Sequence, residues 1–238
     1  MKKIVFLSLI VVIMIALVSC SSIEAGVGYA GYHNGYSLID TQTEKVARID
    51  DDGHITQDAS GTELKTIGNH GGFAVTTAAM FNFNSLDYGF RLFDEGVYGF
   101  VNDNYYVRGS FGPAWEFRLD DRFAVVTGLG VSLDVGLSGV KKFTGVLDDP
   151  NSTQDQELEA LKNVGVICDA GVLALVEGRY FMSEHVFLGL KGTFGYGFKH
   201  FLDVSDDLGN INIDGTSLKQ DIKNSLTYSA ALVLGRTY

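Results

Sequence analysis

The sequence predicts an all-β protein: an up-and-down antiparallel transmembrane β-barrel of about eight strands, with long extracellular loops and short periplasmic turns. Three observations predict this fold. Apolar residues alternate with small or polar residues in about eight segments, which is the period of strands with two different faces. Short and long connections alternate between these segments, as in barrels that cross an outer membrane. The apolar faces carry almost no charge.

The first segment, residues 1–20, has the layout of a secretory signal peptide, which leaves residues 21–238 as a single barrel domain. Two lysines precede an apolar run from Ile4 to Val18, which is too short for a comfortable membrane helix. Leu17 to Cys20 resembles the lipobox of bacterial lipoproteins, in which the thiol of Cys20 is lipidated. Ordinary cleavage just after it is the alternative. Either outcome leaves Cys168 alone, so no disulfide framework is expected.

The strand pattern is clearest from Phe123 to Leu137, where the odd positions are mostly large and apolar and the even positions are mostly small or polar. The same alternation predicts strands at residues 105–119, 166–180 and 186–198, and weaker ones at 23–32, 73–83, 86–93 and 227–238. Pro113 removes a backbone donor from one strand, which predicts a bulge or irregular pairing there.

The connections place both chain ends on the periplasmic side. Short turns are expected at residues 84–85, 120–122 and 182–185, and long loops at 33–72, 94–104, 140–164 and 202–224, with a short amphipathic helix at 154–162. Eight such strands close without edges, so every backbone group finds a partner inside hydrocarbon.

The charges fit this scheme. The four long loops hold 20 acidic and 8 basic residues, and the lipid-facing positions retain only Arg236. The expected inward positions hold six acids and six bases: Glu24, Asp87, Glu116, Asp134, Asp169 and Glu177 with Arg91, Arg108, Arg118, Arg179, Lys191 and Lys199. A soluble barrel would show the inverse arrangement. Because buried charges must be paired and an eight-stranded interior is narrow, we expect a salt-bridge plug. A gated path through Arg108, Arg118, Glu116 and Asp134 is the alternative.

The architecture of residues 23–238 resembles the small outer-membrane barrel families of the OmpA-transmembrane, OmpX and OmpW kind. The most specific element is the C-terminal strand, with Tyr228, Leu232, Leu234 and the terminal Tyr238 in alternation. The resemblance implies that the barrel-insertion machinery recognises this strand, that the cell outer membrane is the location, and that outer-membrane lipids surround the barrel. Arg236 departs from the pattern, because an apolar residue is usual there.

Composition and motifs narrow the function. From Cys20 onward the chain has 16 Lys plus Arg against 29 Asp plus Glu, a net charge of −13, which argues against nucleic acid as a partner. His33, His54, His70 and His200 lie near the outer rim without a His-x-Ser spacing, so we expect no enzyme, and no cofactor or metal is indicated. The expected function is a non-enzymatic anchor for acidic surface loops that contact external ligands. The alternatives are a conduit for small solutes and, third, a lipid-modifying enzyme.

Overall fold

The computed structural model describes residues 20–40, 42–50, 54–56, 61–63, 65–82, 89–101, 104–147, 149–153, 156, 159–160, 164–200, 211–213 and 216–238. The predicted signal peptide up to residue 19, Asp87 and the predicted turn at 84–85 lie outside these ranges. Among the described residues, no helix is long and apolar enough to cross a membrane.

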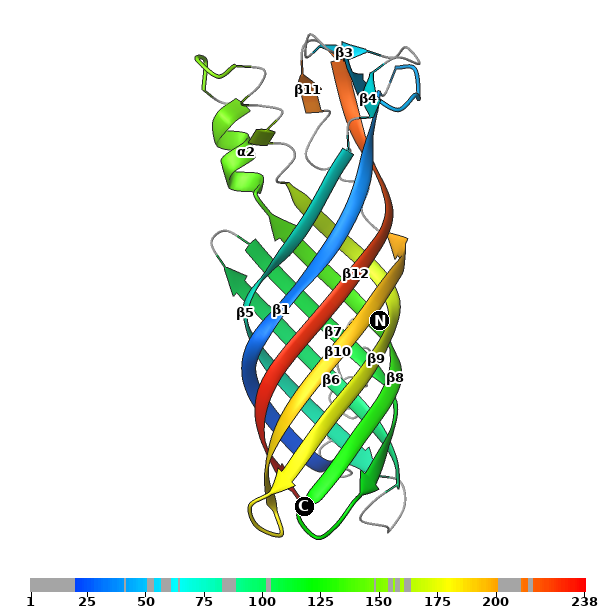
Figure 1. The fold of residues 1–238 in the computed structure, drawn as a ribbon, viewed down its shortest axis with the longest axis vertical. Helices are drawn as coiled ribbons and strands as arrows, with labels where there is room; N and C mark the ends of the chain where they lie inside the picture. The colour runs from blue at the N-terminus through cyan, green and yellow to red at the C-terminus, as the bar shows by residue number, and fades with distance from the viewer. Residues whose placement is uncertain are drawn as a thin grey trace, which may run out of the picture.

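Eight described strands form one closed antiparallel sheet (Figure 1). They are β1 (Cys20–Asp40), β5 (Lys65–Asn82), β6 (Gly89–Val101), β7 (Asn104–Arg118), β8 (Phe123–Ser138), β9 (Gly165–Phe181), β10 (Val186–His200) and β12 (Thr216–Thr237). Each pairs with the next along the chain, and β1 pairs with β12 to close the cylinder. The backbone of Tyr238 donates to Ser21 O at 3.0 Å, so the two ends of the barrel chain meet at one rim. The predicted all-β barrel is confirmed.

The two faces of the wall follow the alternation in the sequence. On β8, Ala124, Val126, Ser132 and Asp134 are buried, while large residues at the odd positions, such as Leu129, are exposed. The inward face is less polar than predicted, because it also carries large apolar side chains. Three apolar clusters line the lumen, centred on Tyr32 and Tyr106, on Met80 and Phe93, and on Phe181 and Phe187. An eight-stranded barrel is just wide enough for such side chains to fill it.

The prediction of a long loop at residues 94–104 is wrong. β6 continues to Val101, β7 begins at Asn104, and the two strands pair along this whole stretch. Asp94, Glu95 and two glycines suggested a loop. The strand continues because the Glu95 carboxylate points inward, where it meets the guanidinium of Arg108.

The predicted loops at 33–72 and 202–224 are too long, because the strands extend further. β1 and β12 stay paired as far as Asp40 and Leu218, and β5 begins at Lys65. Beyond the barrel they carry a small sheet of β2 (Arg48–Ile49), β3 (Ile55–Thr56) and β4 (Thr62–Glu63), and β11 (Ile211–Ile213) adds to β12. We call the part of β1, β5, β11 and β12 above the barrel, together with β2 to β4, the head.

The third long connection, residues 140–164, begins with the helix α2 (Val140–Leu147), which the sequence pattern did not predict. Gln156, Glu159 and Ala160 are helical, at the place where a short helix was expected. The other residues of that expected helix from 154 to 162 lie outside the described ranges.

Pro113 interrupts the pairing of β7 with β8, as expected. The paired residues run down to Phe111 opposite Val131 and resume at Ala114 opposite Gly128, in the same register. The irregularity is therefore a gap in the ladder rather than a bulge, because no residue is added to either strand.

Candidate functional site

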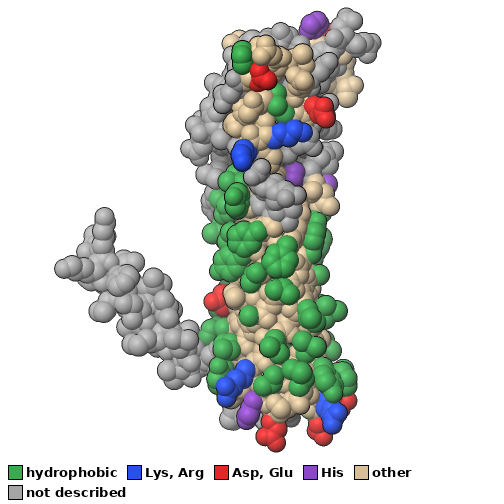
Figure 2. Space-filling model, turned by 90° about the vertical axis from the view of Figure 1, so that its left-hand side faces the viewer, with side chains coloured by type: hydrophobic (Ala, Val, Ile, Leu, Met, Phe, Trp, Pro, Cys, Tyr) green, Lys and Arg blue, Asp and Glu red, His purple; other side chains and the backbone are tan. Residues whose placement is uncertain are grey.

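Large apolar side chains are exposed on all eight barrel strands and form a belt around the barrel, one side of which is visible in Figure 2. Aromatic residues mark its two ends. Near the short turns the belt includes Phe90, Trp115, Phe117, Phe123 and Tyr180, and near the long connections Tyr29, Phe73, Tyr98, Tyr105 and Tyr196. The Trp and Tyr side chains join an apolar ring to a polar group, which suits the two membrane interfaces. The closed sheet and this belt make the protein a transmembrane barrel of the outer membrane, because only closed barrels cross a membrane as strands.

The lipid face carries one charge that the sequence analysis placed in a loop. Asp94 lies on the exposed outward side of β6, between Ala79 and Phe111 of the neighbouring strands. The expectation that Arg236 is alone on this face was therefore wrong. A basic side chain at the bilayer midplane destabilises a barrel by about 2–4 kcal/mol. An acidic side chain destabilises it by less, but the effect has the same sign.

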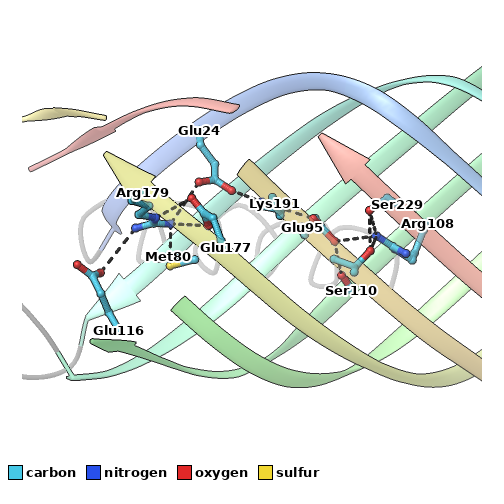
Figure 3. A network of polar contacts seen from close by, with 11 residues as sticks. Glu24, Met80, Glu95, Arg108, Ser110, Glu116, Glu177, Arg179, Lys191 and Ser229 are labelled. Carbon is cyan, nitrogen blue, oxygen red and sulfur yellow. Dashed lines mark hydrogen bonds and ion pairs between the residues drawn. The ribbon is translucent and has the colours of Figure 1, made fainter. Parts of the chain in front are cut away.

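The inward charges nearest the short turns form a cluster around Arg179 (Figure 3). Its Nε lies 2.7 Å from Glu177 Oε1, and its Nη2 lies 3.2 Å from Glu24 Oε2. Its Nη1 lies 3.6 Å from Glu116 Oε2, which is also 3.6 Å from Arg91 Nε. This guanidinium thus joins strands β1, β7 and β9 across the lumen.

Lys191 links this cluster to a second ion pair further along the axis (Figure 3). Its ammonium contacts Glu24 and lies 3.4 Å from Glu95 Oε1. On the far side of Glu95, Arg108 Nη2 lies 3.0 Å from Oε2 and also donates to Thr193 and Ser229 at 2.6 and 3.1 Å. The result is one chain of contacts along the lumen from Glu116 to Arg108.

Two carboxylates nearer the head are held by hydroxyl groups. Asp134 accepts from Tyr106 at 2.5 Å and from Ser132 at 2.6 Å, and Asp169 accepts from Ser225. The two aspartates stand opposite each other on β8 and β9. The described residues therefore bury six inward acids but four bases, so the predicted balance of six against six does not hold.

The structure buries most of the predicted inward residues and brings them together. Nine are at most 6% exposed: Glu24, Arg91, Arg108, Glu116, Asp134, Asp169, Glu177, Arg179 and Lys191. The Arg118 side chain is 29% exposed at the rim, where it contacts Glu116 and stacks on Phe181. Lys199 is exposed, so its inward assignment was wrong, because the register shifts between Gly197 and Lys199 and breaks the alternation.

Glu95 is the inward residue that sequence reasoning missed. It continues the odd-numbered inward face of Arg91 and Phe93, and it stands opposite Ser110. Extending the alternation through the glycines after Phe93 would have found it.

The predicted insertion signal lies at the end of β12. Leu232, Leu234 and Tyr238 are exposed on the outward face, and Tyr228 is half-buried there against Tyr29. Arg236 shares this face, with its guanidinium 5.4 Å from the Tyr238 ring centre. Cys20, the candidate for lipidation, is the first residue of β1.

Among the described residues, the lumen opens at the rim where β1 begins and β12 ends. A cavity of about 890 Å³ lies there between the turns, reaching Arg91, Glu116 and Arg118. Beyond it the side chains of Arg179, Lys191 and Arg108 are at most 1% exposed. These side chains fill the barrel, so a solute could pass only if they moved. Among the described residues, no three His, Cys, Asp or Glu side chains lie together as metal ligands would.

Comparison with family models and with curated proteins finds no match. Among solved structures, Neisserial surface protein A is similar to the chain at 10% identity and a TM-score of 0.43, over 91% of this chain and 97% of that one. The attachment invasion locus protein Ail of Yersinia pestis is 8% identical, with a TM-score of 0.30, over 88% and 97%. A Pseudomonas aeruginosa FadL homologue is 10% identical, with a TM-score of 0.24, over 91% and 90%.

Proposed function

We propose that the barrel is a non-enzymatic anchor that displays its head and its acidic connecting segments to a basic ligand outside the cell. The observation that carries this proposal is the length of the β1 and β12 pair. Beyond Tyr29, at the upper edge of the belt, β1 continues for eleven residues to Asp40, still paired with β12. That is roughly 35 Å along the strand. Spanning the membrane takes only about 9–11 residues. The additional length of the strand pair therefore extends outside the membrane, where a ligand can reach it.

The head is folded, which favours binding. Leu38, Ala47 and Leu218 are each completely buried, and Ala47 N donates to Leu38 O at 2.8 Å. Ser37 donates to Glu63 at 2.7 Å, which ties β4 to β1. A surface already ordered before binding loses less entropy on binding than a flexible loop does.

The charge of the connections selects the kind of ligand. Residues 41–64, 140–164 and 201–215 together contain 15 acids and 5 bases. A field of one sign raises the rate of association with ligands of the opposite sign, and added salt weakens it. A basic peptide or a basic protein surface therefore fits best.

The test compares two barrels in vesicles. One is the wild-type mature chain, and the other has residues 42–63 replaced by a short Gly-Ser turn. An oligolysine peptide and an oligoglutamate peptide are the probes. We expect the wild type to bind oligolysine in a salt-dependent way and the shortened barrel to bind it several-fold more weakly. Equal binding by both barrels, or preference for oligoglutamate, would refute the proposal. Heat-modifiable gel migration checks that both barrels are folded.

A small-solute conduit is the second candidate, and the cavity at the Arg118 rim favours it. Planar-bilayer recordings separate the two functions. Discrete openings of the wild-type barrel, abolished by bulky substitutions at Thr193, would support the conduit. If bilayers that contain inserted barrels show no conductance, the conduit is excluded and the anchor function is favoured.

A further inference from the structure

The outer wall of the barrel contains a hollow of about 480 Å³. We call it the lateral hollow. Its lining includes Phe90, Pro113, Trp115, Leu129, Ala174 and Val176. Phe90, Trp115, Leu129 and Val176 are 38%, 48%, 69% and 56% exposed and belong to the lipid-facing belt. The lateral hollow therefore opens towards lipid.

The sequence explains why the wall is hollow here. Pro113 coincides with the gap in the ladder between β7 and β8. On β9, the outward residue Ala174 lines the hollow and is small. Large apolar residues surround this spot, so a depression with apolar walls remains.

The position of the lateral hollow identifies what fills it. It is continuous with the belt, whose solvent is the acyl chains of the membrane. An unfilled hollow would leave its walls without van der Waals partners on one side. We propose that the lateral hollow binds one acyl chain of an anionic phospholipid in the periplasmic leaflet in preference to a zwitterionic one, and that this phospholipid exchanges more slowly than its neighbours.

The rim supplies a place for the headgroup. Thr127, which lines the hollow, lies five residues along β8 from Arg122 in the turn, or about 17 Å along the strand. One leaflet contributes about 15 Å of hydrocarbon, and strand tilt shortens the projected distance. Arg122 is exposed, with Nη1 3.5 Å from the Tyr180 hydroxyl. A lipid phosphate at these two groups puts its acyl chain at the depth of the hollow.

The experiment uses Trp115, the one tryptophan of the chain, as a reporter inside the site. The mature chain is refolded into phosphatidylcholine vesicles that contain rising fractions of phosphatidylglycerol with brominated acyl chains, which quench tryptophan on contact. Ala174→Phe fills the hollow. Leu232→Phe, an equally apolar enlargement on β12 outside the hollow, is the matched control. Arg122→Ala removes the headgroup contact.

We expect quenching of the wild type and of Leu232→Phe to reach half its limit at a several-fold lower brominated fraction than quenching of Ala174→Phe. The brominated fraction at half-maximal quenching of Arg122→Ala should lie between the values for the wild type and for Ala174→Phe. Native mass spectra after detergent exchange retain one phosphatidylglycerol on the wild type and none on Ala174→Phe. If the four curves coincide, the hollow samples lipid at random and the proposal is wrong. Retained detergent alone, or a dimer that covers Trp115, overturns it as well. Ala174→Leu replaces Ala174→Phe if the latter does not fold.

Discussion

Glu95 on β6 and Arg108 on β7 form an ion pair inside the barrel, with 3.0 Å between Oε2 and Nη2 and both side chains fully buried. The pair joins a segment that looked like a loop to the charge network of the lumen. Lys191 also reaches Glu95, so this carboxylate holds two cations. Its removal is the most direct test of the network.

The Glu95→Leu substitution should destabilise the folded barrel by about 3–5 kcal/mol, because it leaves buried cations without their partner. Urea unfolding in vesicles, followed by Trp115 fluorescence, measures this loss. Glu184→Ala, which removes an exposed acid from a turn, should change stability little. The double variant Glu95→Leu, Arg108→Leu should lose less than the single one. A single variant as stable as the wild type would show that the ion pair contributes nothing.

Substitution of Asp94 should stabilise the barrel, whereas substitution of Glu95 should destabilise it. Because the Asp94 carboxylate faces lipid on β6, Asp94→Ala should stabilise the barrel by about 1 kcal/mol, less than the 2–4 kcal/mol known for basic residues at the midplane. The same unfolding assay measures it. A destabilised variant would mean that this side chain is not in hydrocarbon.

The seam between β1 and β12 is tightly packed at Gly28. A Cβ on this residue would lie 2.0 Å from Ala230 O and 2.6 Å from Ala231 Cα, both backbone atoms that cannot move aside cheaply. Gly28→Ala should therefore cost about 1–3 kcal/mol, the usual range for overpacking, or prevent closure. Gly109→Ala is the control, since nothing lies within 4 Å of its Cβ position. The heat-modifiable fraction on gels reports closure, and equal fractions for both variants would count against the seam geometry.

The C-terminal strand should determine how fast the barrel assembles in cells. Removing Tyr238, or replacing Leu234 by Asp, should slow assembly several-fold, because the insertion machinery is expected to read this outward row. The protease-resistant, heat-modifiable fraction after a pulse of synthesis measures the rate. Phe194→Asp, at an exposed belt position on β10, separates recognition from simple loss of belt hydrophobicity. Should it slow assembly equally, no special role of the strand end would remain.

Much of the fold could be read from the sequence because its signals are local. The alternation from Phe123 to Leu137 and the short turns at 120–122 and 182–185 needed no knowledge of distant residues. Where the alternation was interrupted by polar or glycine-rich stretches, the strand ends were misplaced, as in β6 and at the head end of β1. The inward assignment of Lys199 failed because one register shift reverses every later side chain.

Period two and the exclusion of charge from one face determined by themselves that this chain closes into a cylinder with its ions inside, since strands cross hydrocarbon only as a closed sheet without unpaired edges. Which ions meet was decided only by the tertiary structure. Arg179 contacts Glu24 across 155 positions of sequence. Such pairs depend on the tilt and stagger of the closed sheet, which no local pattern encodes.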